Sequence, residues 1–295
     1  MVAHKVRRLC VGLVWLCLVL LTTDASARNY PLFVVYTTKP VKVVKRWNPL
    51  ALYLSKNIGE TFKVTPLLYD DFIREVETGQ PALVVTNLLN YGALKEKAGL
   101  IPIAVPAWNV AGQGIGEYGA VIFARKGSGI GAPADLTGKV VMVPSRYSLA
   151  ALVGLKTLND LGIKVTDLAL IKSVKTHENV VFGVVNGAAD AGIVRTGTLE
   201  EMAEHKAVNL DDIVVINRQF DAFPYMHSTV LYPEWLLCAT GSLPAGIVES
   251  IKKTLASMDV THEVSLQMGL WGWKTLEEGT LPSVAPLFDI QKMVP

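Results

Sequence analysis

The turn Ser145-Arg146-Tyr147-Ser148 carries the side chains best suited to binding chemistry in this sequence. It follows an apolar run that stops at Pro144 and precedes the amphipathic run 148–161. The first N–H groups of a helix have no intrahelical partners and carry about half a positive charge, so an anion is stabilised there. Both serines add hydroxyl donors, and Arg146 could bind two oxygens of one oxyanion. The alternative is that a serine only caps the helix while Arg146 points to solvent.

Polar side chains also end three other apolar runs. Tyr36 lies near the end of 31–38, Thr86 and Asn87 end 82–87, and Arg195 ends 189–195. Ligands of open α/β sheets bind beyond the carboxyl ends of the strands, so these residues are candidate ligand contacts. Turn and cap chemistry is the alternative for Thr86 and Asn87. For Arg195 the alternative is an ion pair with Glu200 or Glu201.

The elements that must position these residues alternate along the chain. Apolar runs predict strands over 31–38, 62–69, 82–87, 101–108, 118–125, 138–143, 168–174, 189–195, 212–217 and 228–233. Apolar spacing of three and four residues, with Pro40 at a start and Gly59 and Gly162 at ends, predicts helices between them. Asp70 and Thr176 are candidate caps for two of these helices.

This alternation occurs once before Glu117 and once after it. It predicts an α/β fold whose sheets are mainly parallel and flanked by helices. The glycine-rich stretch 109–117 and the stretch 219–227 are natural crossovers. We therefore expect two lobes, one formed by residues 28–117 with 222–295 and the other by residues 118–221, with a ligand cleft between them.

Residues 1–27 have the layout of a secretory signal peptide. The basic start MVAHKVRR is followed by the apolar run LCVGLVWLCLVLL and by Ala-Ser-Ala at 25–27. We expect cleavage after Ala27 and export of the mature protein. The alternative is an uncleaved anchor, although the apolar run is shorter than the roughly 20 residues of a membrane span.

Composition limits the classes of partner. The predicted signal carries Lys5, Arg7, Arg8 and Asp24, so its removal turns the net charge of +2 into zero. Nothing electrostatic then indicates nucleic acid or an anionic membrane as a partner. Only Cys238 remains, so we expect no internal disulfide. We expect a soluble monomer.

Four stretches of the chain resemble a known family. They are VVTNLLNYGALKEKAGL, YGAVIFARKGSGIGAPADLTGKVVMV, KTHENVVFGVVNGAADAGIV and STVLYPEWLL. They resemble the phosphonate-type periplasmic binding proteins of ABC importers, and more closely the related sensor domains of some histidine kinases, such as tetrathionate sensors. The resemblance implies a type II, two-lobed Venus-flytrap fold that closes on a small oxyanion.

The resemblance also implies particular binding residues. The family's tyrosine after the third strand falls on Tyr91, and the tyrosine that begins the crossover strand falls on Tyr118. The family's histidine before the Asp-Ala-Gly element falls on His177. The serine- and threonine-rich turn of the phosphonate binders falls on 145–148. Arg146 is a departure there, and it leaves room for an anion other than phosphonate.

Other motifs do not support a different chemistry. GQGIG (112–116) and GSGIG (127–131) lack the strand-to-helix context of nucleotide loops. His205, His227 and His262 have no metal-ligand spacing, so we expect neither metal nor cofactor. The sequence therefore predicts a periplasmic protein that captures a small oxyanion for an ABC permease or a separate membrane sensor kinase. The alternatives are an enzyme that uses His177, and a ligand-free structural or chaperone-like protein.

Overall fold

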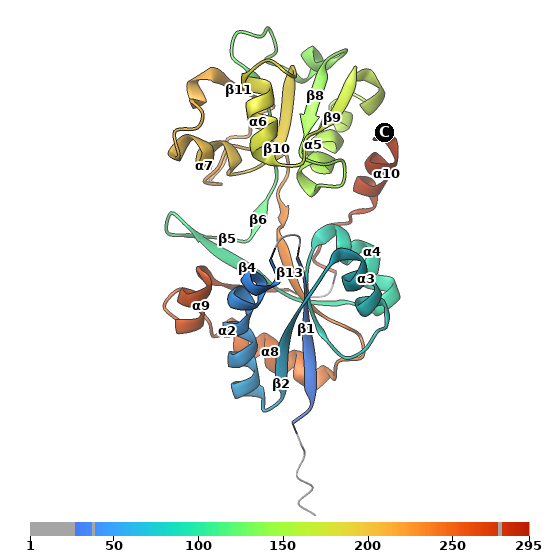
Figure 1. Cartoon of the computed structure of the whole chain (residues 1–295), viewed down its shortest axis with the longest axis vertical. Helices are drawn as coiled ribbons and strands as arrows, with labels where there is room; N and C mark the ends of the chain where they lie inside the picture. The colour runs from blue at the N-terminus through green and yellow to red at the C-terminus, as the bar shows by residue number, and fades with distance from the viewer. Residues whose placement is uncertain (1–26, 37–38, 277–278, 295) are drawn as a thin grey trace, which may run out of the picture.

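The computed structural model describes residues 27–36, 39–276 and 279–294. Within these ranges the chain forms two lobes, one above the other along the long axis of the molecule, each built on its own sheet (Figure 1). Apart from Ala27, the predicted signal peptide lies outside the described residues. Within the part of the chain that is described, no helix is both long enough and apolar enough to cross a bilayer.

The first lobe is built on a mixed sheet in the order β14-β4-β13-β3-β1-β2, with β5 paired to β4. Its strands are β1 (Asn29–Val35), β2 (Thr61–Leu67), β3 (Leu83–Asn87), β4 (Ile101–Val110), β5 (Gln113–Ile115), β13 (Trp235–Ala239) and β14 (Leu270–Thr275). Strands β1, β2 and β3 run parallel, and the apolar runs of β1 and β3 suit strands covered on both faces.

Helices cover both faces of this first sheet. They are α2 (Pro40–Ile58), α3 (Tyr69–Glu77), α4 (Leu88–Ala98), α8 (Ala245–Ala256) and α9 (Glu263–Met268). Helix α2 begins with Pro40 in its first turn and ends at Gly59, whose φ of 79° is the left-handed value that glycine adopts freely. Leu50 and Leu54 of α2 pack with Ile251 and Leu255 of α8 in one buried cluster.

The second lobe is built on a sheet in the order β11-β7-β10-β8-β9. Its strands are β7 (Ala120–Arg125), β8 (Val140–Val143), β9 (Leu170–Ser173), β10 (Ala191–Arg195) and β11 (Ile213–Ile216). Its helices are α5 (Leu149–Asp160), α6 (His177–Val185) and α7 (Thr198–Glu204), with short 3-10 turns at 133–136, 165–167 and 210–212. Strand β10 lies in the middle of the sheet and ends with Arg195.

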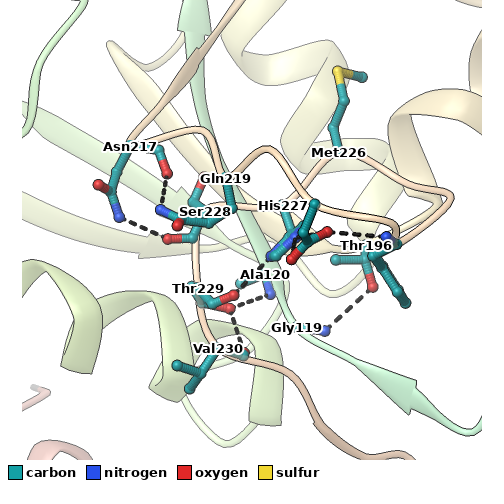
Figure 2. A network of polar contacts seen from close by, with 12 residues as sticks. Gly119, Ala120, Thr196, Asn217, Gln219, Met226, His227, Ser228, Thr229 and Val230 are labelled. Carbon is teal, nitrogen blue, oxygen red and sulfur yellow. Dashed lines mark hydrogen bonds and ion pairs between the residues drawn. The ribbon is translucent and has the colours of Figure 1, made fainter.

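Two short strands join the lobes. Strand β6 (Glu117–Tyr118) pairs antiparallel with β12 (Tyr232–Pro233) where the chain leaves the first lobe and where it returns. Next to them, Thr229 Oγ1 accepts a hydrogen bond from Ala120 N at 2.9 Å and Ser228 N donates to Ala120 O at 2.8 Å (Figure 2). His227 contacts the carbonyl oxygen of Thr229 through Nδ1 at 2.8 Å. The return segment is therefore fixed to β7 mainly by side chains.

The last helix bridges the lobes. Helix α10 (Ala285–Met293) packs against α5 of the second lobe (Figure 1). Val284, at its start, lies so close to Gly92 of α4 that a Cβ on residue 92 would meet Val284 Cγ2 at 2.1 Å. The prediction placed 222–295 in the first lobe, but α10 and residues 227–229 contact the second lobe. The predicted boundaries between the lobes stay a prediction.

Strand direction differs from the prediction of mainly parallel sheets. Strands β7 and β13 each enter their sheet from the junction between the lobes, so β7 runs antiparallel to β10 and β13 runs antiparallel to β3. The predicted strand 228–233 shortens to β12, because side chains rather than a strand ladder hold its first residues. Strands β5, β13 and β14 and helix α9 were missed. Asp70 does not cap α3, which begins one residue earlier at Tyr69.

Helix α6 packs closely on β10 because Gly192 has no side chain at the contact. A Cβ on Gly192 of β10 would meet Val180 Cγ1 at 2.7 Å and Phe123 Cε1 at 2.8 Å. Val180 and Phe123 are fully buried, so neither side chain can move into free space. This contact fixes His177, at the start of α6, beside the end of β10.

We predict that Gly192→Ala destabilises the protein by about 1–3 kcal/mol, because the added methyl group overpacks this contact. Urea unfolding followed by circular dichroism measures the free energy of unfolding. Gly246→Ala is the matched control, since a Cβ on Gly246 of α8 meets nothing within 4 Å. Equal stability of the Gly192→Ala variant and the wild type would contradict the close packing.

Candidate functional site

A cavity of about 930 Å³ lies beyond the carboxyl ends of β1 and β3. First-lobe elements form most of its wall, α10 adds Phe288 and Gln291, and the second lobe adds Tyr147. The predicted site residues among its lining are Tyr36, Asn87 and Tyr147. The cavity thus lies where the strand ends predicted a ligand cleft, with both lobes in its wall.

Three cations from α2 and its N-cap give this cavity a positive wall. Lys39, Lys42 and Arg46 all line it, and no aspartate or glutamate of the described residues does. Their spacing of three and four residues places them along one side of the helix start, where the helix dipole adds positive charge. Among the described side chains, none of the three forms an ion pair with a carboxylate. The wall therefore carries positive charge that no carboxylate in the described part of the chain neutralises at contact distance.

Arg46 is held against an aromatic ring. Its guanidinium lies over the ring of Trp108, 4.2 Å from the centroid. Burial lowers the pKa of Arg46 from its usual value, and the negative charge of Glu234 opposes this shift. An arginine stays protonated under all ordinary conditions, so the stacked group presents a fixed charge with N–H donors at its edge.

The turn 145–148 of the second lobe supplies the helix cap that the alternative interpretation expected, while its role in anion binding stays a prediction. Ser148 caps α5, because its hydroxyl oxygen accepts a hydrogen bond from Ala151 N at 3.1 Å. Arg146 Nη2 donates to the hydroxyl of Tyr147 at 2.6 Å, and the Arg146 guanidinium lies 4.8 Å from the Tyr147 ring centroid. Ser145 Oγ accepts from Tyr147 N at 3.2 Å. Only Tyr147 of this turn lines the large cavity, and 57% of it is exposed.

A smaller cavity of about 190 Å³ lies beside the linking strands and includes Tyr118, Arg195 and Glu234 in its wall. Arg195 forms an ion pair with Glu234 at 2.5 Å, rather than with Glu200 or Glu201 as the alternative reading had it. Its guanidinium also lies 5.0 Å from the Tyr118 ring centroid. Burial, followed by the charge of Glu234, raises the pKa of Tyr118, so its phenol stays protonated. Trp108 lines both cavities.

His177 lies next to this ion pair. Its Nδ1 accepts a hydrogen bond from the backbone N–H of Arg195 at 3.2 Å, which places the ring proton of the neutral form on Nε2. Burial lowers the pKa of His177, and the charge of Arg195 adds to this effect, whereas Glu178 opposes it. The imidazole is therefore neutral near pH 7.

Six of the predicted site residues line neither cavity. Thr86 is fully buried, and its hydroxyl has no hydrogen-bond partner among the described residues. Tyr91 is partly buried against the largest apolar cluster. Ser145, Arg146, Ser148 and His177 also do not line either cavity. The roles of these residues in binding stay predictions.

Sequence reasoning missed the cations of α2 and several aromatic residues of the cavity. The sequence did contain a sign of Lys39, Lys42 and Arg46. They lie where a predicted helix begins just after a predicted strand, and the helix that follows Ser148 begins in the same way. The aromatic residues Trp108 and Trp235 had no such signal, because each lies in an apolar run typical of a core strand. In the part of the chain that is described, no group of three or more His, Cys, Asp or Glu side chains is placed to hold a metal ion.

Two lobes, each with a sheet and flanking helices, joined by short strands with a cavity between them, define a type II periplasmic binding protein. A model of the family described as "ABC transporter, phosphonate, periplasmic substrate-binding protein" matches residues 32–281, and the chain belongs to this family. The family resemblance and the fold class predicted from the sequence are both confirmed. The protein accordingly has a ligand-binding role in a transport or sensing system.

The chain is also similar to one relative and to two solved structures. The chain is 29% identical over 213 residues to the tetrathionate sensor histidine kinase of Salmonella typhimurium. The aligned region covers 71% of this chain and 36% of that protein. The chain thus spans about a third of this relative's length. PhnD1 from Prochlorococcus marinus in complex with methylphosphonate has a TM-score of 0.61 and 16% identity over 90% of this chain and 97% of that one. A protein from Xanthomonas citri bound to ATP has a TM-score of 0.65 and 14% identity over 90% of this chain and 96% of that one. At these identities the two structures show a shared fold.

We predict that His177 makes the stability of the protein depend on pH. The unfolded chain takes up a proton at the usual histidine pKa of 6.5, whereas the folded protein resists it because the pKa of His177 is lowered. The contribution of His177 is therefore complete above pH 6.5 and is lost as the pH falls through and below that value. Urea unfolding of His177→Gln between pH 7.5 and 5.5 should give a shallower pH dependence than the wild type. Identical slopes would show that His177 is not the group responsible.

Proposed function

We propose that this protein captures a small oxyanion, phosphate- or phosphonate-like or a sulfur oxyanion, in the cavity between its lobes. The observation that carries the proposal is the cavity wall formed by Lys39, Lys42 and Arg46, on which no carboxylate lies within residues 27–36, 39–276 and 279–294. A cleft lined by one sign of charge concentrates ions of the opposite sign and speeds their binding. An anion would supply the negative charge that this wall lacks.

Closure of the two lobes would complete the site. The first lobe contributes the cations of α2 and the amide of Asn87, and the second lobe contributes Tyr147 and the neighbouring turn 145–148. A ligand favours the closed state only through contacts that the open state does not make. We propose that Arg146, Ser145 and Tyr147 supply the contacts that form only in the closed state. They belong to the second lobe, which supplies the smaller part of the cavity wall as it stands.

The proposed role is binding without catalysis. His177 is the residue on which an enzymatic reading rested, and its Nδ1 is occupied by the N–H of Arg195. A general base needs an accessible acceptor atom within reach of a substrate proton. The neutral ring instead offers an Nε2–H donor. We propose that the mature protein begins after Ala27 in the periplasm and delivers its signal or cargo to an ABC permease or a separate membrane sensor kinase.

Loss of a cavity cation should weaken anion binding. We predict that Arg46→Gln and Lys42→Gln each cost about 1.5–3 kcal/mol of binding free energy, as expected for a hydrogen bond to a charged group. Isothermal titration with phosphate, methylphosphonate, sulfate, thiosulfate and tetrathionate measures the change. Lys45→Gln is the matched control, since Lys45 lies on the same helix and does not line the cavity. An equal loss of binding free energy in all three variants would show that the anion responds to the overall charge of the helix, and would contradict a specific site.

A substitution in the turn 145–148 tests the contribution of the second lobe to anion binding. If closure brings the turn 145–148 onto the ligand, Arg146→Ala should weaken binding of the same anions by about 1.5–3 kcal/mol. Its thermal unfolding should stay close to that of the wild type, because Arg146 contacts Tyr147 at the surface. Unchanged affinity would mean that Arg146 only stacks on its neighbour.

A further inference from the structure

We propose that the ligand of this cavity is an organic anion, in which the charged group is attached to a flat apolar body of at least one ring. This inference rests on the proposed function and names the class of ligand more narrowly. It excludes a bare inorganic oxyanion as the preferred ligand.

The size of the cavity is the first argument. A water molecule's share of liquid volume is about 30 Å³, so a cavity of about 930 Å³ corresponds to roughly thirty waters. An inorganic oxyanion is only a few times larger than a water. In the present arrangement of the two lobes it would leave most of the cavity filled with solvent. The volume lies in the upper part of the range of about 300–1,000 Å³ that is typical of sites for larger organic ligands.

The chemistry of the wall is the second argument. Aromatic side chains line the cavity from separate elements, including Tyr69 of α3, Trp108 of β4, Trp235 of β13 and Phe288 of α10. The second lobe adds the ring of Tyr147. A site for a bare inorganic anion has no use for these rings. A ligand that carries an apolar ring can stack on them.

The exposure of these rings is the third argument. Tyr69 is 54% exposed and Tyr147 is 57% exposed, although both line the cavity. The two tyrosines belong to different lobes, so closure over a ring-sized ligand would remove apolar surface of both from water. That burial would favour the closed state.

The charged and apolar parts of the wall adjoin at Trp108. Arg46 stacks on one face of this ring at 4.2 Å, and Lys39 and Lys42 lie toward the same helix start. The positive charge therefore comes from α2 and its N-cap, while α3, β13, α10 and the second lobe contribute rings. A ligand with its anionic group toward α2 would extend its body along these rings.

Matched pairs of ligands test the proposal directly. Isothermal titration should compare methylphosphonate with phenylphosphonate, methanesulfonate with benzenesulfonate, and acetate with benzoate. In at least one pair the ring should lower Kd by about 10- to 100-fold, as expected when a ring is buried against apolar surface. Benzamide, which has the ring but no charge, should bind more weakly than benzoate.

Variants of the exposed rings locate the effect. Tyr69→Ala and Tyr147→Ala should each reduce the preference for the ring, measured as the ratio of Kd values within a pair, by about three- to tenfold. Both residues are largely exposed, so the variants should fold. Phe220→Ala is the control, since Phe220 is 85% exposed and does not line the cavity.

The outcomes separate this inference from the proposed function. Equal Kd values within every pair that binds would overturn the inference and leave anion binding intact. A ring preference that survives both tyrosine substitutions would also overturn it, because the ring would then bind elsewhere. Absence of binding by every anion, small and large, would overturn the proposed function and the inference with it.

Discussion

The constraint on which the structure depends is the connection between the two lobes. Strands β6 and β12 pair only over Tyr118 with Tyr232 and Glu117 with Pro233, a ladder too short to fix two lobes by itself. The side chain of Thr229 bonds to the backbone of β7 at Ala120 (Figure 2). The side chain of Ser228 bonds to the same strand at Ile122. Because these groups are buried, each lost hydrogen bond would leave an unpaired polar atom in the core. The junction also places the turn 145–148 of the second lobe near the strand ends of the first lobe, where Tyr147 completes the wall of the large cavity.

The junction also carries charge, and that charge connects the two cavities. Glu234 follows β12 directly and forms an ion pair with Arg195, while its negative charge also acts on Arg46. Arg46 stacks on Trp108, whose side chain faces both cavities. One carboxylate at the junction thus balances a second-lobe arginine by contact and a first-lobe arginine at a longer distance. The remaining positive charge of α2 faces the large cavity, which supports the proposal of an anionic ligand.

The candidate site was predictable where strand ends and helix starts adjoin in the sequence. Ser148 caps α5, and Tyr36, Asn87 and Tyr147 line the large cavity. Thr86 shows the limit of this reasoning. It is adjacent to Asn87 but is fully buried, because successive residues of a strand point to opposite faces. A strand end indicates the region of a site, and the pleat decides which side chain reaches it. For Arg195, the sequence offered nearby glutamates as partners, and the fold supplied Glu234 from a segment far along the chain.

The sequence by itself determined most of the elements, their alternation in two sets and hence the α/β class with two lobes. Local apolar periodicity, prolines, glycines and caps act within a few residues, so they can be read without the fold. Only the tertiary structure decided the direction of β7 and β13, the docking of α10 on α5 and the aromatic lining of the large cavity. Those features depend on contacts between segments far apart in the chain. The sequence pattern around an apolar residue is the same whether the residue faces a core or a cavity. Only the packing of the lobes distinguishes a core position from a cavity position.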